Sequence, residues 1–174
     1  MNPDRPPVPA WLAGRPLAGG LVVPWITPKL PDGRCIFGSI EQTYAEHALV
    51  YRLCGVCGHR LAPQPAVLLL RASDLPRQCT SEPALHPQCA AYTALACPMV
   101  NGTLDTYRTA PVPGLPLTAS SAVRRGAPAE EWFSVWLKEY HIVVDQGHLA
   151  ASYRGEEPLR IRPITLSHHR PGAS

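Results

Sequence analysis

The sequence has no long hydrophobic run and few aromatic residues. Its nearest approach to an apolar segment, Leu17 to Ile26, is interrupted by Gly19, Gly20 and Pro24, whereas a membrane-spanning helix needs about 20 apolar residues. The first residues also lack the charged-then-apolar order of a secretory signal. We therefore expect a cytoplasmic protein with no membrane segment.

No block of like charge occurs either. The 16 basic and 13 acidic residues give a net charge of +3 and are mixed along the chain, which is typical of an ordinary solvated surface rather than of a phosphate-binding stripe. The GxSxG, P-loop, GxGxxG and HExxH motifs are also missing from the sequence. The sequence therefore favours a protein without catalysis and leaves an enzyme as the less favoured alternative.

Proline and cysteine, in contrast, are abundant. The 21 prolines and 13 glycines interrupt helices and strands, so the loops should be long and the core should need support. In a reducing cytoplasm, the six cysteines are better explained by metal binding than by three disulfides, although a secreted chain would pair them.

Two short motifs supply a complete set of metal ligands. Cys54 and Cys57 form a CxxC pair, and His86 and Cys89 form an HxxC pair further along the chain. Three thiolates and an imidazole are the ligand set of a closed tetrahedral zinc site. Because four protein ligands leave no position for water, the expected cofactor is a structural zinc ion.

The segment Cys54–Cys57 should form a tight turn, called here the knuckle. The sequence leaves three candidates for the fourth ligand, besides the three cysteines. His86 fits the spacing, but Cys79 lies seven residues earlier on an expected loop and His59 lies two residues past the knuckle. Cys97 is excluded, because eight residues of helix at 1.5 Å each place it about 12 Å from Cys89. We expect Cys35 and Cys97 to be small buried side chains.

The order of knuckle, hairpin and helix over about residues 53–97 resembles the treble-clef zinc-finger arrangement. This resemblance invites comparison with HNH-type nucleases, but the sequence has no paired histidines after the knuckle, and His59 and Asn101 are isolated. The resemblance implies a zinc-supported module that binds a protein or a nucleic acid.

Four arginines flank the expected site and support the nucleic-acid alternative. They are Arg52, Arg60, Arg71 and Arg77. The sequence therefore supports two non-enzymatic hypotheses, an interaction protein with a structural zinc ion and a nucleic-acid-binding accessory factor. A third hypothesis is an enzyme, either an HNH-like nuclease or another hydrolase.

Short sequence segments carry a second resemblance. They are similar to segments of small proteins from high-GC actinobacteria and their phages, and they read RCIFG, CGVCG, LHPQCAAY and CPM. This resemblance supports the metal site and implies nothing about a substrate.

The expected fold is a single α+β domain over residues 21–166, preceded by a proline-rich arm (1–20) and followed by a tail (167–174). Periodicity predicts a hairpin of 21–27 with 34–38 and a helix over 41–53 begun by a capping box at Ser39, with a strand from His47 to Leu53 as the alternative. It also predicts a buried strand over 66–70 in a second hairpin and a helix from Pro87 to Ala96. Residues 74–83 should form a loop and 109–128 an exposed linker. A C-terminal β meander is expected over 131–164, with a turn at Gln146-Gly147.

Overall fold

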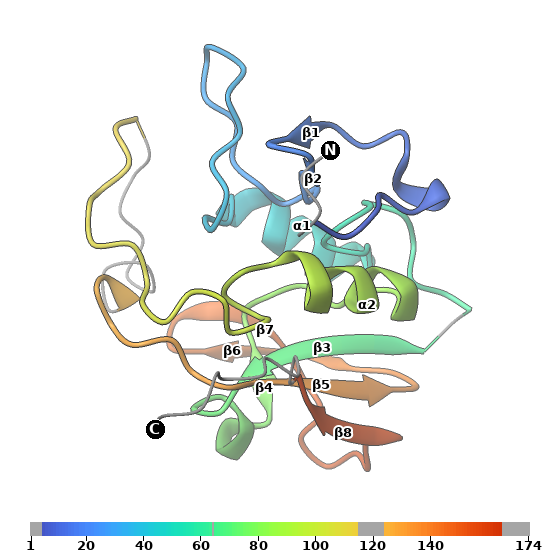
Figure 1. The fold of residues 1–174 in the computed structure, drawn as a ribbon. Helices are drawn as coiled ribbons and strands as arrows, with labels where there is room; N and C mark the ends of the chain where they lie inside the picture. The colour runs from blue at the N-terminus through green and yellow to red at the C-terminus, as the bar shows by residue number, and fades with distance from the viewer. Residues whose placement is uncertain (1–4, 64, 115–123, 165–174) are drawn as a thin grey trace, which may run out of the picture.

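Two α-helices and eight short strands make up the regular structure of the described residues. The computed structural model describes residues 5–63, 65–114 and 124–164 (Figure 1). The elements in order are the 3₁₀ helix η1 (Ala10–Leu12), β1 (Leu17–Ala18), β2 (Leu21–Val22), α1 (Gln42–Tyr51), β3 (Ala66–Arg71), the 3₁₀ helix η2 (Leu75–Arg77), β4 (Cys79–Thr80), α2 (Pro87–Ala96), β5 (Trp132–Leu137), β6 (His141–Asp145), β7 (His148–Ser152) and β8 (Arg160–Pro163).

All strand pairs in this part of the chain are antiparallel. One sheet has the order β3-β5-β8 and another the order β4-β7-β6, while β1 and β2 form a small hairpin. In the first sheet, Val67 lies opposite Trp136 and Val135 lies opposite Ile161. The expected mixed fold class, α and β with antiparallel sheets, is confirmed.

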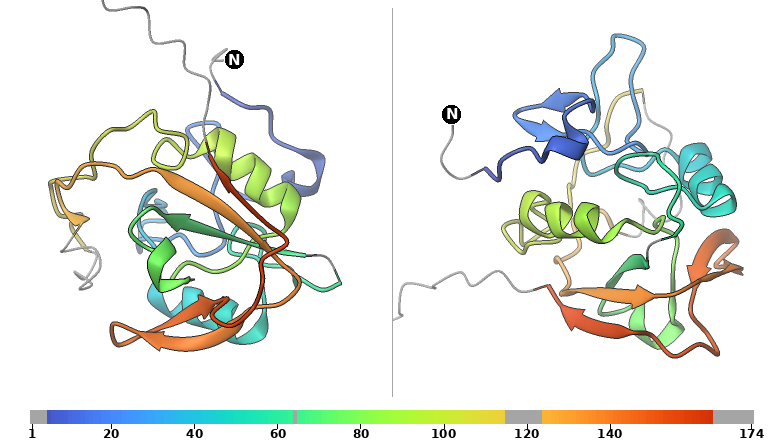
Figure 2. Two further views of the ribbon diagram at one scale, coloured as in Figure 1. Left: turned by 90° about the horizontal axis from the view of Figure 1, so that it is seen from below. Right: turned by 90° about the vertical axis from the view of Figure 1, so that its right-hand side faces the viewer.

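The core gathers around β3. The strand Ala66–Arg71 is buried along all but its last residue, as expected for an apolar run without alternation. The same hydrophobic cluster contains Leu49 of α1, Tyr92 of α2 and Leu137 of β5. Figures 1 and 2 show α2 between the N-terminal segment and the β3-β5-β8 sheet, so α2 is covered on two sides.

Both predicted helices are present, but the residue that caps the start of α1 differs from the predicted one. α2 spans Pro87–Ala96, as the proline and the apolar run predict. The N-cap of α1 is Glu41, whose carboxylate accepts a hydrogen bond from the Tyr44 backbone N–H, so the capping box at Ser39 is wrong.

The predicted strand pairings differ most from the structure. The hairpin of 21–27 with 34–38 is wrong: β2 pairs with β1, and the later segment contributes one bridge, Lys29 with Cys35. The second hairpin is also wrong, since β3 pairs with β5, and the 74–83 loop contains η2 and β4.

The C-terminal strands do not form one meander. β6 and β7 form a hairpin through Gln146 and Gly147, both at positive φ as predicted for this turn. This hairpin belongs to the sheet of β4, whereas β5 and β8 belong to the sheet of β3. The chain therefore alternates between two sheets over 131–164.

The described part of the proline-rich arm contains η1 and β1. Leu12 is fully buried and anchors this segment to the core, whereas Trp11 is 53% exposed. The tail at 167–174, the end of the expected domain at 165–166 and the linker residues 115–123 lie outside the described residues. Neither described helix is long and apolar enough to cross a membrane.

Candidate metal centre

Four side chains from two separate segments meet at one buried point. Cys54, Cys57, His86 and Cys89 each offer one ligand atom, and these atoms all lie within 4.8 Å of one another. Cys57 Sγ lies 3.3 Å from His86 Nδ1. All four residues are buried, so the group can hold a metal ion away from solvent.

The CxxC segment forms a knuckle closed by backbone hydrogen bonds. The Cys54 N–H donates to the His59 carbonyl at 2.8 Å, and the Gly58 N–H donates to the Cys54 carbonyl at 2.8 Å. Gly58 has φ +77°, a conformation that glycine adopts without strain. A bridge between Leu53 and Arg60 holds the two ends of the knuckle together.

The second pair of ligands is positioned by β3 and by the start of α2. Leu85 exchanges two backbone hydrogen bonds with Val67 of β3, at 2.8 and 2.9 Å. His86, the next residue, is the N-cap of α2, and Cys89 lies in its first turn. The Gly55 N–H donates to the Ala84 carbonyl at 3.1 Å, so the knuckle and the segment before α2 are in direct contact.

The outer hydrogen bond of His86 selects its ligand atom. His86 Nε2 lies 2.8 Å from the Arg60 carbonyl oxygen, which can only accept a hydrogen bond, so Nε2 must carry the proton. The Nδ1 lone pair then faces Cys57 and the other sulfurs. A metal-bound histidine commonly donates its second ring N–H to a carbonyl in this way.

The three sulfurs interact strongly with one another. Hydrogen bonds from the Cys57 and Cys89 thiols, with backbone N–H groups of Cys57 and His86, lower the pKa of Cys54 to about 3. The same closeness to Cys54 and Cys57 raises the pKa of Cys89 far above its ordinary value. One thiolate therefore forms readily, but a third needs a positive charge at the centre, which a divalent cation supplies.

Arg15 places a positive charge close to the site from the N-terminal segment. Its guanidinium donates to the Val23 carbonyl at 3.0 and 3.3 Å. Burial lowers the pKa of Arg15, and negative charge at Cys57 acts in the opposite direction. A divalent ion bound by three thiolates would carry one net negative charge, which Arg15 would partly offset.

Trp25 covers the outside of the knuckle. Its backbone N–H donates to the Val56 carbonyl at 2.9 Å. A Cβ added to Gly58 would lie 2.7 Å from Cδ1 of the Trp25 ring. The knuckle therefore requires glycine at position 58 both for its φ and for this contact.

The Gly58→Ala variant should lose about 3 kcal/mol of stability, since it combines left-handed backbone strain with overpacking against Trp25. Urea unfolding of the metal-loaded protein measures this loss. Gly33→Ala is the matched control, because Gly33 has φ +88° and no atom within 4 Å of an added Cβ. Equal losses for the two variants would show that the Trp25 contact is unimportant.

The other ligand candidates lie outside the group. Cys79 is buried on β4, where its sulfur accepts a hydrogen bond from Arg154 at 3.4 Å, and His59 is exposed. Neither belongs to the cluster of possible ligands. Cys35 and Cys97 are half-buried rather than buried.

The flanking arginines are largely engaged within the protein. Arg71 and Arg77 both pair with Asp74, and Arg52 donates to the Tyr140 carbonyl at 2.9 Å. Asn101, the polar residue considered for a nuclease site, donates to the Leu95 carbonyl and accepts from the Thr103 N–H.

The residues around the ligands were not predictable from the motifs. Trp25, Arg15 and the Arg60 carbonyl carry no short-range sequence signal that links them to the cysteines.

Comparison with protein-family models, curated proteins and solved structures finds no match to this chain.

Proposed function

We propose that Cys54, Cys57, His86 and Cys89 bind one zinc ion with a structural role. The observation that carries this proposal is the convergence of three sulfurs and one imidazole nitrogen within 4.8 Å in a buried place. Zinc prefers this donor set and a tetrahedral arrangement. Four protein ligands complete the coordination, so the ion would have no position for a reacting water.

The order of elements supports the treble-clef comparison in part. The knuckle comes first, β3 follows, and α2 carries the last ligand in its first turn. The regular hairpin between knuckle and helix is replaced by one bridge, Val67 with Leu85. We therefore propose a treble-clef-like module whose strand also belongs to a larger sheet.

Within this proposal, the protein serves as a non-catalytic interaction protein. Large apolar side chains of α1 are partly exposed next to the zinc module: Tyr44, Val50 and Tyr51 are 45%, 50% and 57% exposed. Neighbouring exposed apolar side chains are typical of protein-binding surfaces. Nucleic-acid binding is the weaker alternative, because Arg71 and Arg77 are already paired with Asp74.

Elemental analysis of the purified protein tests the metal proposal. We expect equimolar zinc in the wild type, loss of the metal in Cys89→Ser and His86→Ala, and retention in Cys35→Ser, whose cysteine lies outside the group. Replacement with cobalt should give the absorption of a tetrahedral thiolate complex. A wild-type protein without stoichiometric metal would refute the proposal.

Binding to a DNA or RNA duplex at increasing salt separates the two partner classes. An interaction protein should show no binding that falls steeply with salt, whereas phosphate contacts give a strong salt dependence. Steep salt-dependent binding lost in Arg60→Ala would replace the protein-partner proposal with the nucleic-acid one.

A further inference from the structure

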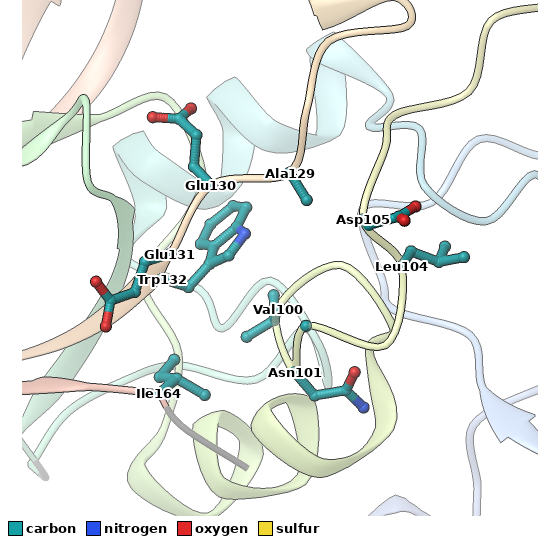
Figure 3. A pocket seen from close by; sticks show the side chains of 10 residues that line it. Val100, Asn101, Leu104, Asp105, Ala129, Glu130, Glu131, Trp132 and Ile164 are labelled. Atoms are coloured by element: carbon teal, nitrogen blue, oxygen red, sulfur yellow. The ribbon is translucent and has the colours of Figure 1, made fainter. Parts of the chain in front are cut away.

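The acidic side chains around the hollow beside α2 do not converge on one ligand. This hollow of about 360 Å³ lies between the turn after α2 and the start of β5. In Figure 3 the carboxylates of Asp105 and Glu131 lie on opposite sides of Trp132, whereas a small-molecule site normally has a few polar groups directed at the same ligand. The outer edge of β6 is a stronger candidate for binding.

β6 (His141–Asp145) is the outer strand of its sheet. It pairs with β7 on one side, and in the described part of the chain no strand pairs with its other side. Ile142 and Val144 are 39% and 70% exposed, and both views of Figure 2 show the hairpin of β6 and β7 at the margin of the molecule. An open strand edge of this kind can accept a further strand.

The turn after β6 fixes which of its backbone groups point outward. Asp145 lies opposite His148 across a two-residue turn, and the residues that flank such a turn form a hydrogen-bonded pair. Every second residue counted back from Asp145 therefore directs its N–H and C=O groups toward β7, whereas Ile142 and Val144 direct theirs outward. Among the described residues, no backbone hydrogen bond reaches these outward groups.

The edge of β8 (Arg160–Pro163), in contrast, is protected against pairing. β8 is exposed along its length, but it ends in a proline, which cannot donate a hydrogen bond to another strand. Pairing of two β8 strands about Ile161 would place Arg160 of one copy opposite Arg162 of the other, and like charges in that position repel. The middle of β6, Ile142-Val143-Val144, has neither a proline nor a charged residue, so the usual protection of a strand edge is missing there.

We propose that β6 pairs with β6 of a second copy of this chain in an antiparallel ladder centred on Val143. In this register Ile142 of one copy lies opposite Val144 of the other, so the outward N–H and C=O groups of the two residues bond to each other. The exposed side chains of Ile142 and Val144 also meet, because opposite residues of a ladder lie on the same face. A two-fold axis uses the same segment of both copies, so the assembly ends at a dimer.

The charges at the two ends of β6 are complementary in this register. His141 of one copy lies opposite Asp145 of the other. Within each copy, Glu156 lies 3.2 Å from His141, and Arg154 lies 3.4 Å from Asp145. The dimer therefore brings the end of β6 that carries Arg154 next to the end that carries Glu156, and opposite charges across a strand pair stabilise it.

Sedimentation velocity of the purified protein, from micromolar to near-millimolar concentration, tests for the dimer. We expect the sedimentation coefficient to rise with concentration toward the value of a dimer. The association should be weak, because a ladder of 5 residues from each copy is smaller than a standard protein interface.

Paired lysine variants locate the interface. Ile142→Lys combined with Val144→Lys places lysines opposite lysines and should weaken the dimer about tenfold or more. Leu159→Lys combined with Ile161→Lys is the matched control, because it adds the same charge at the same spacing to exposed side chains at the edge of β8. This control should leave the dimer intact. Thermal unfolding checks that each variant is folded.

Two measurements test the register. In hydrogen exchange, the amides of Ile142 and Val144 should become protected as the protein concentration rises, whereas the amide of Val143, which faces β7, should be protected throughout. Val143→Cys should form a disulfide between two copies in a glutathione buffer, since opposite residues at a non-hydrogen-bonded position have Cα atoms about 4.5 Å apart. Wild-type protein treated in the same way controls for the native cysteines.

Several results would overturn the proposal. They are a protein that stays monomeric at near-millimolar concentration and a dimer that survives the lysine pair in β6. Protection of the Ile142 and Val144 amides at every concentration would equally refute it, because another segment of the same chain would then cover the edge. If the β6 lysine variant does not fold, Val143→Cys still decides the matter: a dimer linked through position 143 supports the register, and its absence refutes it.

Discussion

Removal of the proposed zinc ion, by a chelator or by Cys54→Ser, is expected to abolish the cooperative unfolding transition of the protein. Apparent binding energies of structural zinc sites are on the order of 10 kcal/mol or more, whereas a whole domain is stable by only about 5–15 kcal/mol. The ligands also connect the knuckle to α2 and, through Leu85 and Val67, to β3. Circular dichroism and thermal unfolding with and without chelator measure the effect.

The control for this experiment is Cys35→Ser, because Cys35 is half-buried and is not part of the ligand group. It should retain the transition and its sensitivity to the chelator. Zinc added back to the chelated wild type should restore folding, whereas Cys54→Ser should not recover. A chelated protein that unfolds at the same temperature as the untreated one would contradict a structural role for the metal.

The second large effect is expected for Asp74→Ala. Asp74 is 2% exposed, and its carboxylate accepts hydrogen bonds from Arg71 at 2.7 and 2.9 Å and pairs with Arg77. Burial lowers the pKa of Arg71, but the hydrogen bond and charge of Asp74, with smaller contributions from Glu82 and Tyr107, raise it overall. Loss of the carboxylate leaves two partly buried guanidinium groups without this partner, so we expect a loss of about 3 kcal/mol in urea unfolding.

Asp32→Ala provides the comparison for Asp74→Ala. Asp32 also pairs with an arginine, Arg34, but the two side chains are 50% and 73% exposed. An exposed pair of this kind contributes about 1 kcal/mol or less. If Asp74→Ala costs no more than Asp32→Ala, the buried pairs of Asp74 do not stabilise the fold.

Local signals in the sequence predicted the parts of the fold that depend on neighbouring residues. Pro87 and the following apolar run predicted the bounds of α2, and the Gln146-Gly147 turn predicted the hairpin of β6 and β7. The CxxC and HxxC spacings predicted which four side chains would meet. In each case the signal lies within a few residues of the structure that it specifies.

Strand partners were predicted poorly, because alternation shows that a segment is a strand but does not show which strand it joins. β5 and β6 are neighbours in sequence, yet β6 pairs with β7, which pairs with β4, and β5 pairs with β3 and β8. Asp74 is a different case. The sequence placed it in a loop, and its two arginine partners lie only three residues away on either side, but its burial could not be read from those neighbours.

The pairing of β3 with β5 has a consequence for synthesis of the chain. The proposed metal-binding module is complete once Ala96 has left the ribosome, but the apolar strand Ala66–Arg71 receives its partner only when residues 132–137 have left it. Until then, the nascent chain presents an unpaired apolar edge, which is prone to aggregation. If the proposed zinc ion binds early, α2 would cover one face of β3 during this interval, while the edge of the strand still lacks β5.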